Sequence, residues 1–292
     1  MEMLKLTNPV TPILFVMCAS VVCMAELPSK APELKDHDLY VSGTAGRLHV
    51  NDSAGRNVPV IFVPSLGGTD RQWQAQADHL HGRHRVILVE LRGHGKSDAP
   101  SNGDYSLEAM ANDIHAIVET LSLKRVVLVG HSMGGGVALA YAAEHPDRVA
   151  GLLLVDPIDD PHLHPGMTKA FIDRLQSENY ESEIVGRWNT ILEGAKPKVK
   201  KIVLADLLST PRETILGSMR EMENFDASAA VAKYPGPMVS VVTRFNNVAS
   251  ALHKISNHVR AIQVDNTSHW LQMDAPAEFN RIMDDFLLRT GS

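Results

Sequence analysis

Short runs of β-branched and other apolar residues recur along the chain from residue 58 onward. Runs of this kind, closed by glycine, proline or polar residues, are typical of strands buried on both faces. The predicted strands are 58–63, 86–90, 126–129, 151–155, 238–243 and 261–264. The stretches between them have apolar residues at helical spacing, and the predicted helices are 71–81, 105–121, 137–144, 248–255 and 277–288. Strands that alternate with helices predict an α/β fold, a mostly parallel sheet with helices on both faces.

Two segments depart from this alternation. Residues 39–50 carry two short strand-like runs around Gly43-Thr44-Ala45-Gly46, which predicts a hairpin. Residues 157–237 contain several helical stretches and no convincing strand. The helices predicted there are 166–177, 182–193, 199–208 and 212–223. Because this helical insertion follows a strand end, we expect it to cover a site as a lid.

The first 25 residues have a pattern of their own. The segment 12–25 is apolar and uncharged and follows Met-Glu-Met-Leu-Lys, which is typical of a secretory signal peptide cleaved after Ala25. It is too short to favour a membrane-spanning helix, although an uncleaved anchor stays open as an alternative. Cys18 and Cys23 both lie inside it, so a processed chain has no disulfide. We therefore expect a secreted or periplasmic protein without a stable membrane partner.

The predicted organisation is one domain with an insertion. It comprises a signal peptide at 1–25, a lead-in and hairpin at 26–57, a core at 58–156, a helical lid at 157–237 and the second part of the core at 238–292. The 292-residue chain has a formal net charge of −6 and contains no basic block. This charge pattern argues against nucleic acid as a partner and leaves a small molecule as the expected ligand.

The most informative motif is Gly130-His131-Ser132-Met133-Gly134, which joins the apolar run 126–129 to the Ala-rich stretch 137–144. A serine raised at the tip of a sharp strand-to-helix turn needs neighbours with almost no side chain, and Gly130 and Gly134 meet that need. The helix that follows points its first amides at the same spot. The pattern predicts that Ser132 is a nucleophile.

Other candidate residues fall at the ends of the neighbouring predicted strands. The loop 64–68 follows the strand 58–63 and is rich in glycine, and Asp156 follows the strand 151–155. Ligands of parallel sheets bind at the carboxyl ends of the strands. We therefore expect this loop, Ser132 and Asp156 to converge.

Taken together, the motifs from residue 58 onward resemble those of the α/β-hydrolase superfamily. Gly-His-Ser-Met-Gly-Gly at 130–135, Leu-Arg-Gly-His-Gly-Lys-Ser at 91–97 and a late Ser-His at 268–269 occur in the order found there. The similarity is greatest to lidded serine esterases, enol-lactone hydrolases and cofactor-free haloperoxidase-like members. The resemblance implies the α/β-hydrolase fold with an inserted helical lid.

The resemblance also implies roles for single residues. Ser132 corresponds to the nucleophile and His269 to the general base. The backbone amides of Met133 and Leu66 correspond to the oxyanion hole. Family members usually carry His-Gly before the second of these amides, whereas this chain has Pro64-Ser65.

The acid of the triad is the main departure from the family pattern. Most members have an aspartate after the strand that resumes beyond the lid, but this chain reads Thr-Arg-Phe-Asn-Asn at 243–247. Some lidded relatives place the acid at the end of the preceding strand, where this chain has Asp156. We therefore expect Asp156 to be the acid. The alternatives are Asp159, Asp160, Asp265, Asp274 and a ring oriented by Asn246.

The sequence thus predicts a serine hydrolase that cleaves a carboxylic ester or lactone through an acyl-enzyme intermediate, with no cofactor or metal. In this superfamily dehalogenases and epoxide hydrolases use aspartate at the position of Ser132. Two other functions stay open, a catalytically weak ligand-binding or signalling protein and a perhydrolase. His79, His81 and His84 are interpreted as solvated surface. Asp159, Asp160, His162 and His164 have a more ligand-like spacing at the entrance to the lid, but we expect no metal there either.

Overall fold

Strand β5 (Val126–His131), the predicted nucleophile strand, lies in the interior of an eight-stranded sheet in the described part of the chain. The computed structural model describes residues 37–53, 55, 57–163 and 167–291. The predicted signal peptide and most of the predicted lead-in lie outside the described residues. None of the helices in these ranges has the length and hydropathy needed to cross a bilayer.

The sheet has the strand order β1-β2-β4-β3-β5-β6-β7-β8. The predicted hairpin forms β1 and β2, which pair antiparallel, and β2 pairs antiparallel with β4. All the remaining pairs are parallel. The strands other than β5 are β1 (His37–Ser42), β2 (Arg47–Asp52), β3 (Val60–Val63), β4 (Val86–Val89), β6 (Val149–Val155), β7 (Met238–Val242) and β8 (Arg260–Gln263).

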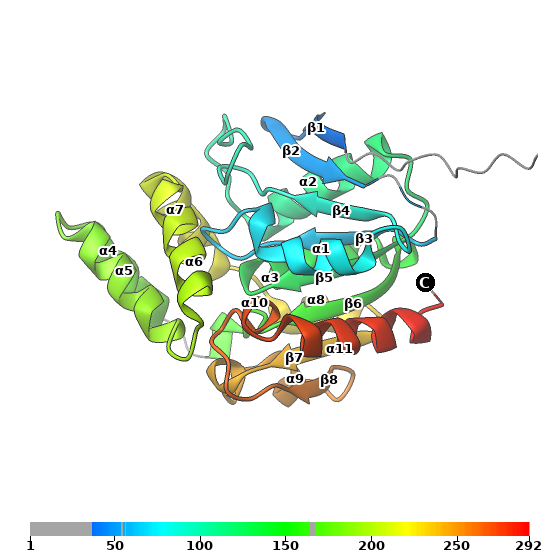
Figure 1. Ribbon diagram of the computed structural model, residues 1–292. Helices are drawn as coiled ribbons and strands as arrows, with labels where there is room; N and C mark the ends of the chain where they lie inside the picture. The colour runs from blue at the N-terminus through cyan, green and yellow to red at the C-terminus, as the bar shows by residue number, and fades with distance from the viewer. Residues whose placement is uncertain (1–36, 54, 56, 164–166, 292) are drawn as a thin grey trace, which may run out of the picture. The chain divides into compact units, whose positions relative to one another are not determined.

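Helices cover both faces of the sheet, as predicted (Figure 1). One face carries α1 (Gln74–Leu80) and α11 (Pro276–Arg289), which pack against each other. The other carries α2 (Leu107–Thr120), α3 (Met133–Glu144) and α8 (Ala227–Lys233). Successive β5 residues point to opposite faces, so Leu128 packs in the core under α2 and α3 while Val129 packs in the core under α1 and α11. This double coverage explains why β5 reads as a continuous apolar run.

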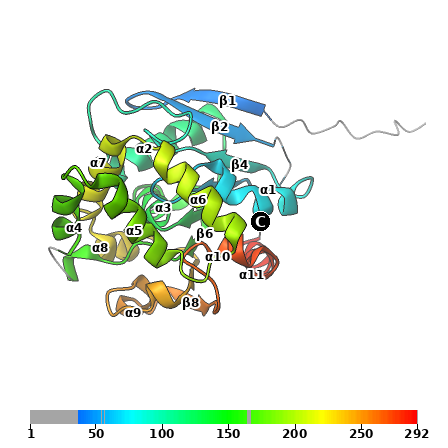
Figure 2. The same ribbon diagram turned by 60° about the vertical axis from the view of Figure 1, so that its left-hand side comes forward.

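Helices α4 (Met167–Leu175), α5 (Tyr180–Ile191), α6 (Pro197–Ser209) and α7 (Arg212–Met222) follow one another between β6 and β7. We call these four helices the helical insertion. Figures 1 and 2 show them grouped at one end of the sheet, to one side of the helices that cover its faces. Short helices α9 (Leu252–Ile255) and α10 (Leu271–Asp274) lie near β7 and before α11.

Two helix predictions need correction. The predicted helix 248–255 is reduced to α9, because residues 244–246 form a 3-10 turn and Val248 is exposed instead of packing on a helical face. Helix α8 was not predicted, and its signal is the Asp226 carboxylate, which accepts a hydrogen bond from the Ala229 amide as an N-cap. Because α8 packs against α3, it covers a face of the sheet and is not part of the helical insertion.

Candidate active site

Ser132 occupies a strained turn between β5 and α3. Its backbone has φ 53° and ψ −119°, a conformation that residues with a side chain rarely adopt. A Cβ atom on Gly130 would lie closer than 3.0 Å to the Gly134 carbonyl oxygen, and one on Gly134 equally close to the Pro64 carbonyl oxygen. Only glycine therefore lets the turn close and lets the loop after β3 approach it.

His269 and Asp156 form a direct contact. The Nδ1 atom of His269 lies 3.0 Å from Oδ2 of Asp156, whose side chain is fully buried at the end of β6. Asp156 has a positive φ of 38°, so a second residue of the site holds an uncommon backbone conformation. Because a neutral imidazole that donates from Nδ1 keeps its lone pair on Nε2, this contact leaves Nε2 able to accept a proton.

Thr243 holds the Asp156 carboxylate from the neighbouring strand. Its amide donates to Oδ1 over 2.6 Å, and its hydroxyl donates to Oδ2. Sequence reasoning missed this residue, although Thr243 opens the segment in which the family usually has its acid. These two donors and the His269 ring satisfy the buried carboxylate.

The other proposed acids are held away from His269. Asp159 accepts from the Ser250 hydroxyl, Asp160 from Ser228, and Asp265 from the Gln263 amide. Asp274 accepts from the Ser268 amide and hydroxyl, and Asn246 donates to the Pro157 carbonyl. Of the described carboxylates, Asp156 is the one within ion-pair distance of His269.

His131 supports the loop that carries His269. Its Nε2 lies 2.9 Å from the His269 carbonyl oxygen, and the two ring centres are 4.6 Å apart. Burial lowers the pKa of His131 well below its usual value, so the ring is neutral and donates from Nε2. The Gln272 amide lies 3.3 Å from the other ring nitrogen. His131, the residue that precedes Ser132, therefore holds the backbone of His269 through a hydrogen bond.

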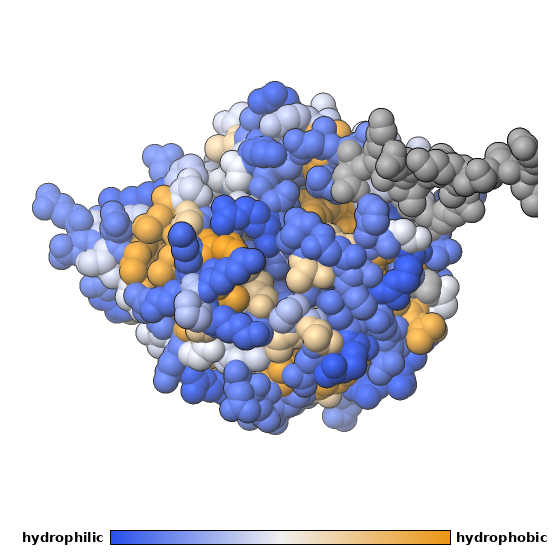
Figure 3. Space-filling view, viewed as in Figure 1, coloured by the Kyte–Doolittle hydropathy of each residue, from blue (hydrophilic) through white to orange (hydrophobic). Residues whose placement is uncertain are grey.

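A cavity of about 710 Å³ joins these residues to the helical insertion. Ser65, Leu66, Ser132, Asp156 and His269 lie on the sheet side. The insertion contributes Phe171 and Arg174 from α4, Arg187, Trp188 and Ile191 from α5, and Met219 and Met222 from α7. The predicted convergence of the loop 64–68, Ser132 and Asp156 is therefore observed. Figure 3 shows that apolar residues also gather on the outer surface of the insertion.

The comparisons with known proteins agree with this geometry. Residues 58–183 match the family model described as the alpha/beta hydrolase fold. A thermophilic esterase from Thermogutta terrifontis superimposes with a TM-score of 0.73 at 25% identity, over 88% of this chain and 100% of that chain. The enol-lactonase from Burkholderia xenovorans LB400 superimposes with a TM-score of 0.72 at 21% identity, over 86% of this chain and 100% of that one. These matches show that the chain has the α/β-hydrolase fold.

Curated sequences add hydrolases of more than one kind. Epoxide hydrolase 3 from Xenopus tropicalis is 25% identical over 286 residues, which are 82% of this chain and 74% of that protein. Putative carbamate hydrolases from Caulobacter and Variovorax paradoxus are 35% to 39% identical, and uncharacterized proteins from Mycobacterium are 38% identical, but these matches span only 30% to 51% of the relatives' lengths. These relatives support a hydrolase, and their names do not agree on one substrate.

The amides expected to form the oxyanion hole belong to Met133, which follows Ser132 in the chain, and to Leu66, which lines the same cavity. Met133 is the first residue of α3, so its amide has no partner within the helix. Leu66 lines the cavity, and the described residues provide no acceptor for its amide. There is no direct hydrogen bond between Ser132 and His269, although both line the cavity. Catalytic hydrogen bonds are often long without substrate and shorten when it binds.

The histidines considered as metal ligands do not gather at one point. His79 pairs with Asp284 over 2.9 Å. His162 lies 3.8 Å from Asp160, and His164 falls outside the described residues. Among the residues that the structure describes, the group of three with ligand atoms within 4.8 Å of one another is His49, Asp70 and Glu90.

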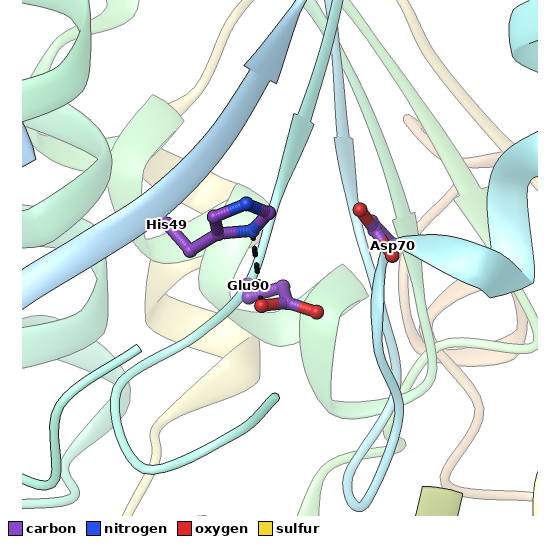
Figure 4. A group of neighbouring side chains, drawn as sticks. All are labelled: His49, Asp70 and Glu90. Atoms are coloured by element: carbon purple, nitrogen blue, oxygen red, sulfur yellow. Dashed lines mark ion pairs between the residues drawn. The ribbon is translucent and has the colours of Figure 1, made fainter. Parts of the chain in front are cut away.

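Two members of this group, His49 and Glu90, form contacts with each other and with neighbouring residues of the chain. Figure 4 shows one ion pair, between His49 on β2 and Glu90 after β4, with Asp70 to one side. The His49 Nδ1 lies 3.0 Å from Glu90, which also accepts the Lys96 amide over 2.7 Å. The other ring nitrogen of His49 contacts Asp38. Because the protein engages both ring nitrogens and the carboxylate, we assign no metal to this group.

Proposed function

We propose that this protein of the α/β-hydrolase fold is a serine hydrolase that cleaves a carboxylic ester or lactone through an acyl-enzyme intermediate. The observation that carries the proposal is the 3.0 Å contact between His269 and Asp156 in the wall of the cavity that Ser132 also lines. A nucleophile, a base and an acid that orients the base are the groups that this chemistry needs. Serine at the elbow, where epoxide hydrolases of the superfamily use aspartate, favours acyl transfer.

The reaction begins with attack by the Ser132 hydroxyl oxygen on the substrate carbonyl carbon. The hydroxyl proton passes to Nε2 of His269, and the buried Asp156 carboxylate stabilises the imidazolium that forms. The Leu66 and Met133 amides donate to the oxyanion, and each such donor typically contributes about 10²–10³ in rate. The carbon–oxygen bond then breaks, and His269 returns its proton to the leaving alcohol.

Hydrolysis of the acyl-enzyme repeats these steps with water. His269 takes a proton from the water, whose oxygen attacks the acyl carbon, and then returns a proton to Ser132 as the carboxylic acid leaves. A lactone follows the same route, except that its alcohol stays attached to the acyl group. The helical insertion acts as a lid that limits the entry of bulk water to the cavity. No metal or cofactor takes part in these steps.

The deciding experiment is intact-mass analysis after treatment with a fluorophosphonate, which labels an activated serine. We expect one adduct on the parent protein and none on Ser132→Ala, with hydrolysis of short 4-nitrophenyl esters lost in the same variant. The matched control is Ser65→Ala, which changes another serine in the cavity wall and keeps the label. An unlabelled, folded parent that binds ligand without turnover would instead identify a ligand-binding protein on a hydrolase scaffold.

We also propose that the protein is exported and cleaved after Ala25. The support is the uncharged apolar segment 12–25, which precedes a segment of mixed charge with two prolines. The N-terminal sequence and mass of the protein recovered from the medium or periplasm test this. A chain that retains residue 1 and fractionates with membranes would contradict it.

A further inference from the structure

The charged side chains that line the cavity are not equally paired. Asp156 binds His269 and Thr243, and Asp159 accepts from Ser250. Arg174 on α4 is paired with Glu183, with nitrogen and oxygen 3.2 Å apart, and its guanidinium lies over the Phe171 ring. Each of these charged side chains therefore already has a partner within the chain.

Arg187 on α5 differs from them. Within the described ranges, no carboxylate lies within ion-pair distance of its guanidinium, and no side chain or carbonyl accepts a hydrogen bond from it. Arg187 is exposed, and its side chain lines the cavity beside the buried Trp188. The surrounding protein removes part of the water around the guanidinium, and this desolvation lowers the pKa of Arg187.

An arginine in this position stays charged and offers five donors in a planar fork. Partial desolvation without a counter-charge is unfavourable, and an anion that enters the cavity removes that penalty. A carboxylate matches the fork with two parallel hydrogen bonds. The remainder of the insertion side of the cavity is mainly apolar, with Phe171, Ile191 and Met222 among its residues.

We infer that Arg187 binds a carboxylate group of the substrate, remote from the bond that is cleaved. The substrate class is then a half-ester of a dicarboxylic acid, or an ester or lactone with a carboxylate side chain. This inference rests on the proposed serine hydrolase function and adds a specificity determinant to it. Its anchor is on the insertion, whereas the reacting groups are on the sheet side.

The test compares anionic and neutral substrates of equal length. Mono-4-nitrophenyl adipate and suberate place the carboxylate on the acyl side, and their methyl esters are the neutral partners. For the alcohol side, 4-carboxyphenyl hexanoate is compared with its methyl ester. We expect the parent enzyme to prefer the anionic member of at least one pair. In Arg187→Gln that preference, measured as a ratio of kcat/KM values, should fall about 10- to 100-fold, mainly through KM.

Two variants control the interpretation. Arg174→Gln removes the arginine that is already paired with Glu183, and its preference should stay within about threefold of the parent value. Arg187→Lys keeps the charge without the fork and should retain part of the preference. The urea-unfolding midpoint of Arg187→Gln and its labelling by the fluorophosphonate, each compared with the parent, test whether the fold and the activated serine are intact.

The possible failures are distinguishable. If the parent and Arg187→Gln hydrolyse neutral and anionic members of every pair with the same ratio, the Arg187 inference is wrong and the serine hydrolase function stands. If the parent hydrolyses no ester and takes no fluorophosphonate label, the proposed function itself fails. If Arg174→Gln abolishes the preference for anionic substrates as strongly as Arg187→Gln does, the assignment of the substrate carboxylate to Arg187 is wrong.

Discussion

At the residue scale, the proposed acid, Asp156, and the residue that supports it, Thr243, lie at the ends of two neighbouring strands. Asp156 follows β6, and Thr243, which donates to it twice, follows β7. The segment after β7 is where relatives usually have the carboxylate, so this chain has a hydrogen-bond donor there and a carboxylate one strand away. Because Thr243 holds the Asp156 carboxylate, that carboxylate can still contact and orient the His269 ring.

Replacing the acid should therefore remove most of the activity. In Asp156→Asn we expect kcat/KM for a 4-nitrophenyl ester to fall by about 10³–10⁴, because an amide neither stabilises the imidazolium nor fixes the same tautomer. Asp159→Asn, which changes another carboxylate in the cavity wall, should lose less than about tenfold. Steady-state kinetics on the purified variants measure both, and equal losses would remove Asp156 from the triad.

Thr243 gives a smaller and more specific effect. Thr243→Val keeps the amide donor but removes the hydroxyl donor to a buried carboxylate, which typically costs about 1.5–3 kcal/mol. We expect lower stability in urea and a loss of about tenfold in kcat, with KM nearly unchanged. Thr243→Ser restores the hydroxyl and should recover both. A valine variant with parental kcat would show that the amide alone holds Asp156.

The sequence predicts those site residues that belong to local motifs occurring in a fixed order along the chain. The elbow motif, the late histidine and an aspartate at a strand end predicted Ser132, His269 and Asp156 as site residues, and the structure brings the last two into contact. Thr243 and Arg187 were missed. The reason is that each is defined by a partner, or by the absence of one, on a segment far away in the sequence.

At the element scale, the turn between β5 and α3 depends on residues without side chains. Gly134→Ala would press a methyl group against the Pro64 carbonyl, where backbone and not a flexible side chain must move. Gly186, inside α5, has open space around its Cβ position. We expect Gly134→Ala to lower the free energy of unfolding by more than about 2 kcal/mol and Gly186→Ala to raise it by about 0.5–1 kcal/mol.

Urea titrations of both glycine variants measure these changes through the midpoint at constant slope. The two substitutions add the same atoms, so their opposite signs isolate local geometry from helix propensity. A stable, active Gly134→Ala would mean that the loop after β3 is free to shift away from the elbow.

Element prediction succeeded where burial on both faces fixes the pattern. The interior strands β3 to β7 fall within about two residues of the predicted runs, because any polar residue there would be buried without a partner. Prediction failed for α8 and for the extent of α9. Both are short, and short helices depend on caps and tertiary packing more than on an apolar period.

At the scale of the whole molecule, buried neutral histidines make stability depend on pH. Burial lowers the pKa of His94 from 6.5 to about 4, and only the Arg92 carbonyl is within reach of its ring. Between these values the unfolded chain binds a proton at His94 that the native protein does not bind. The free energy of unfolding therefore falls as pH decreases from about 6.5 to 4, by up to about 3 kcal/mol from this group.

The comparison of the parent with His94→Gln tests this sign. Urea unfolding at several pH values between 7.5 and 4.5 gives the free energy of unfolding as a function of pH. Its decrease toward low pH should be smaller in the variant by the contribution of one proton. His131 adds to the slope in the same direction in both proteins, because burial also lowers its pKa. Equal slopes would show that His94 titrates alike in the folded and unfolded chains.

The insertion is also tied to the histidine loop through the backbone. The His269 amide donates to the Ile191 carbonyl at the end of α5, and the Lys196 amide donates to Asp274, which also accepts the Ser268 amide. In protein engineering terms, the insertion is not an interchangeable module. A chimera that takes α4 to α7 from a relative therefore also needs that relative's segment matching 266–274. Without it, the new insertion would displace His269, the proposed base.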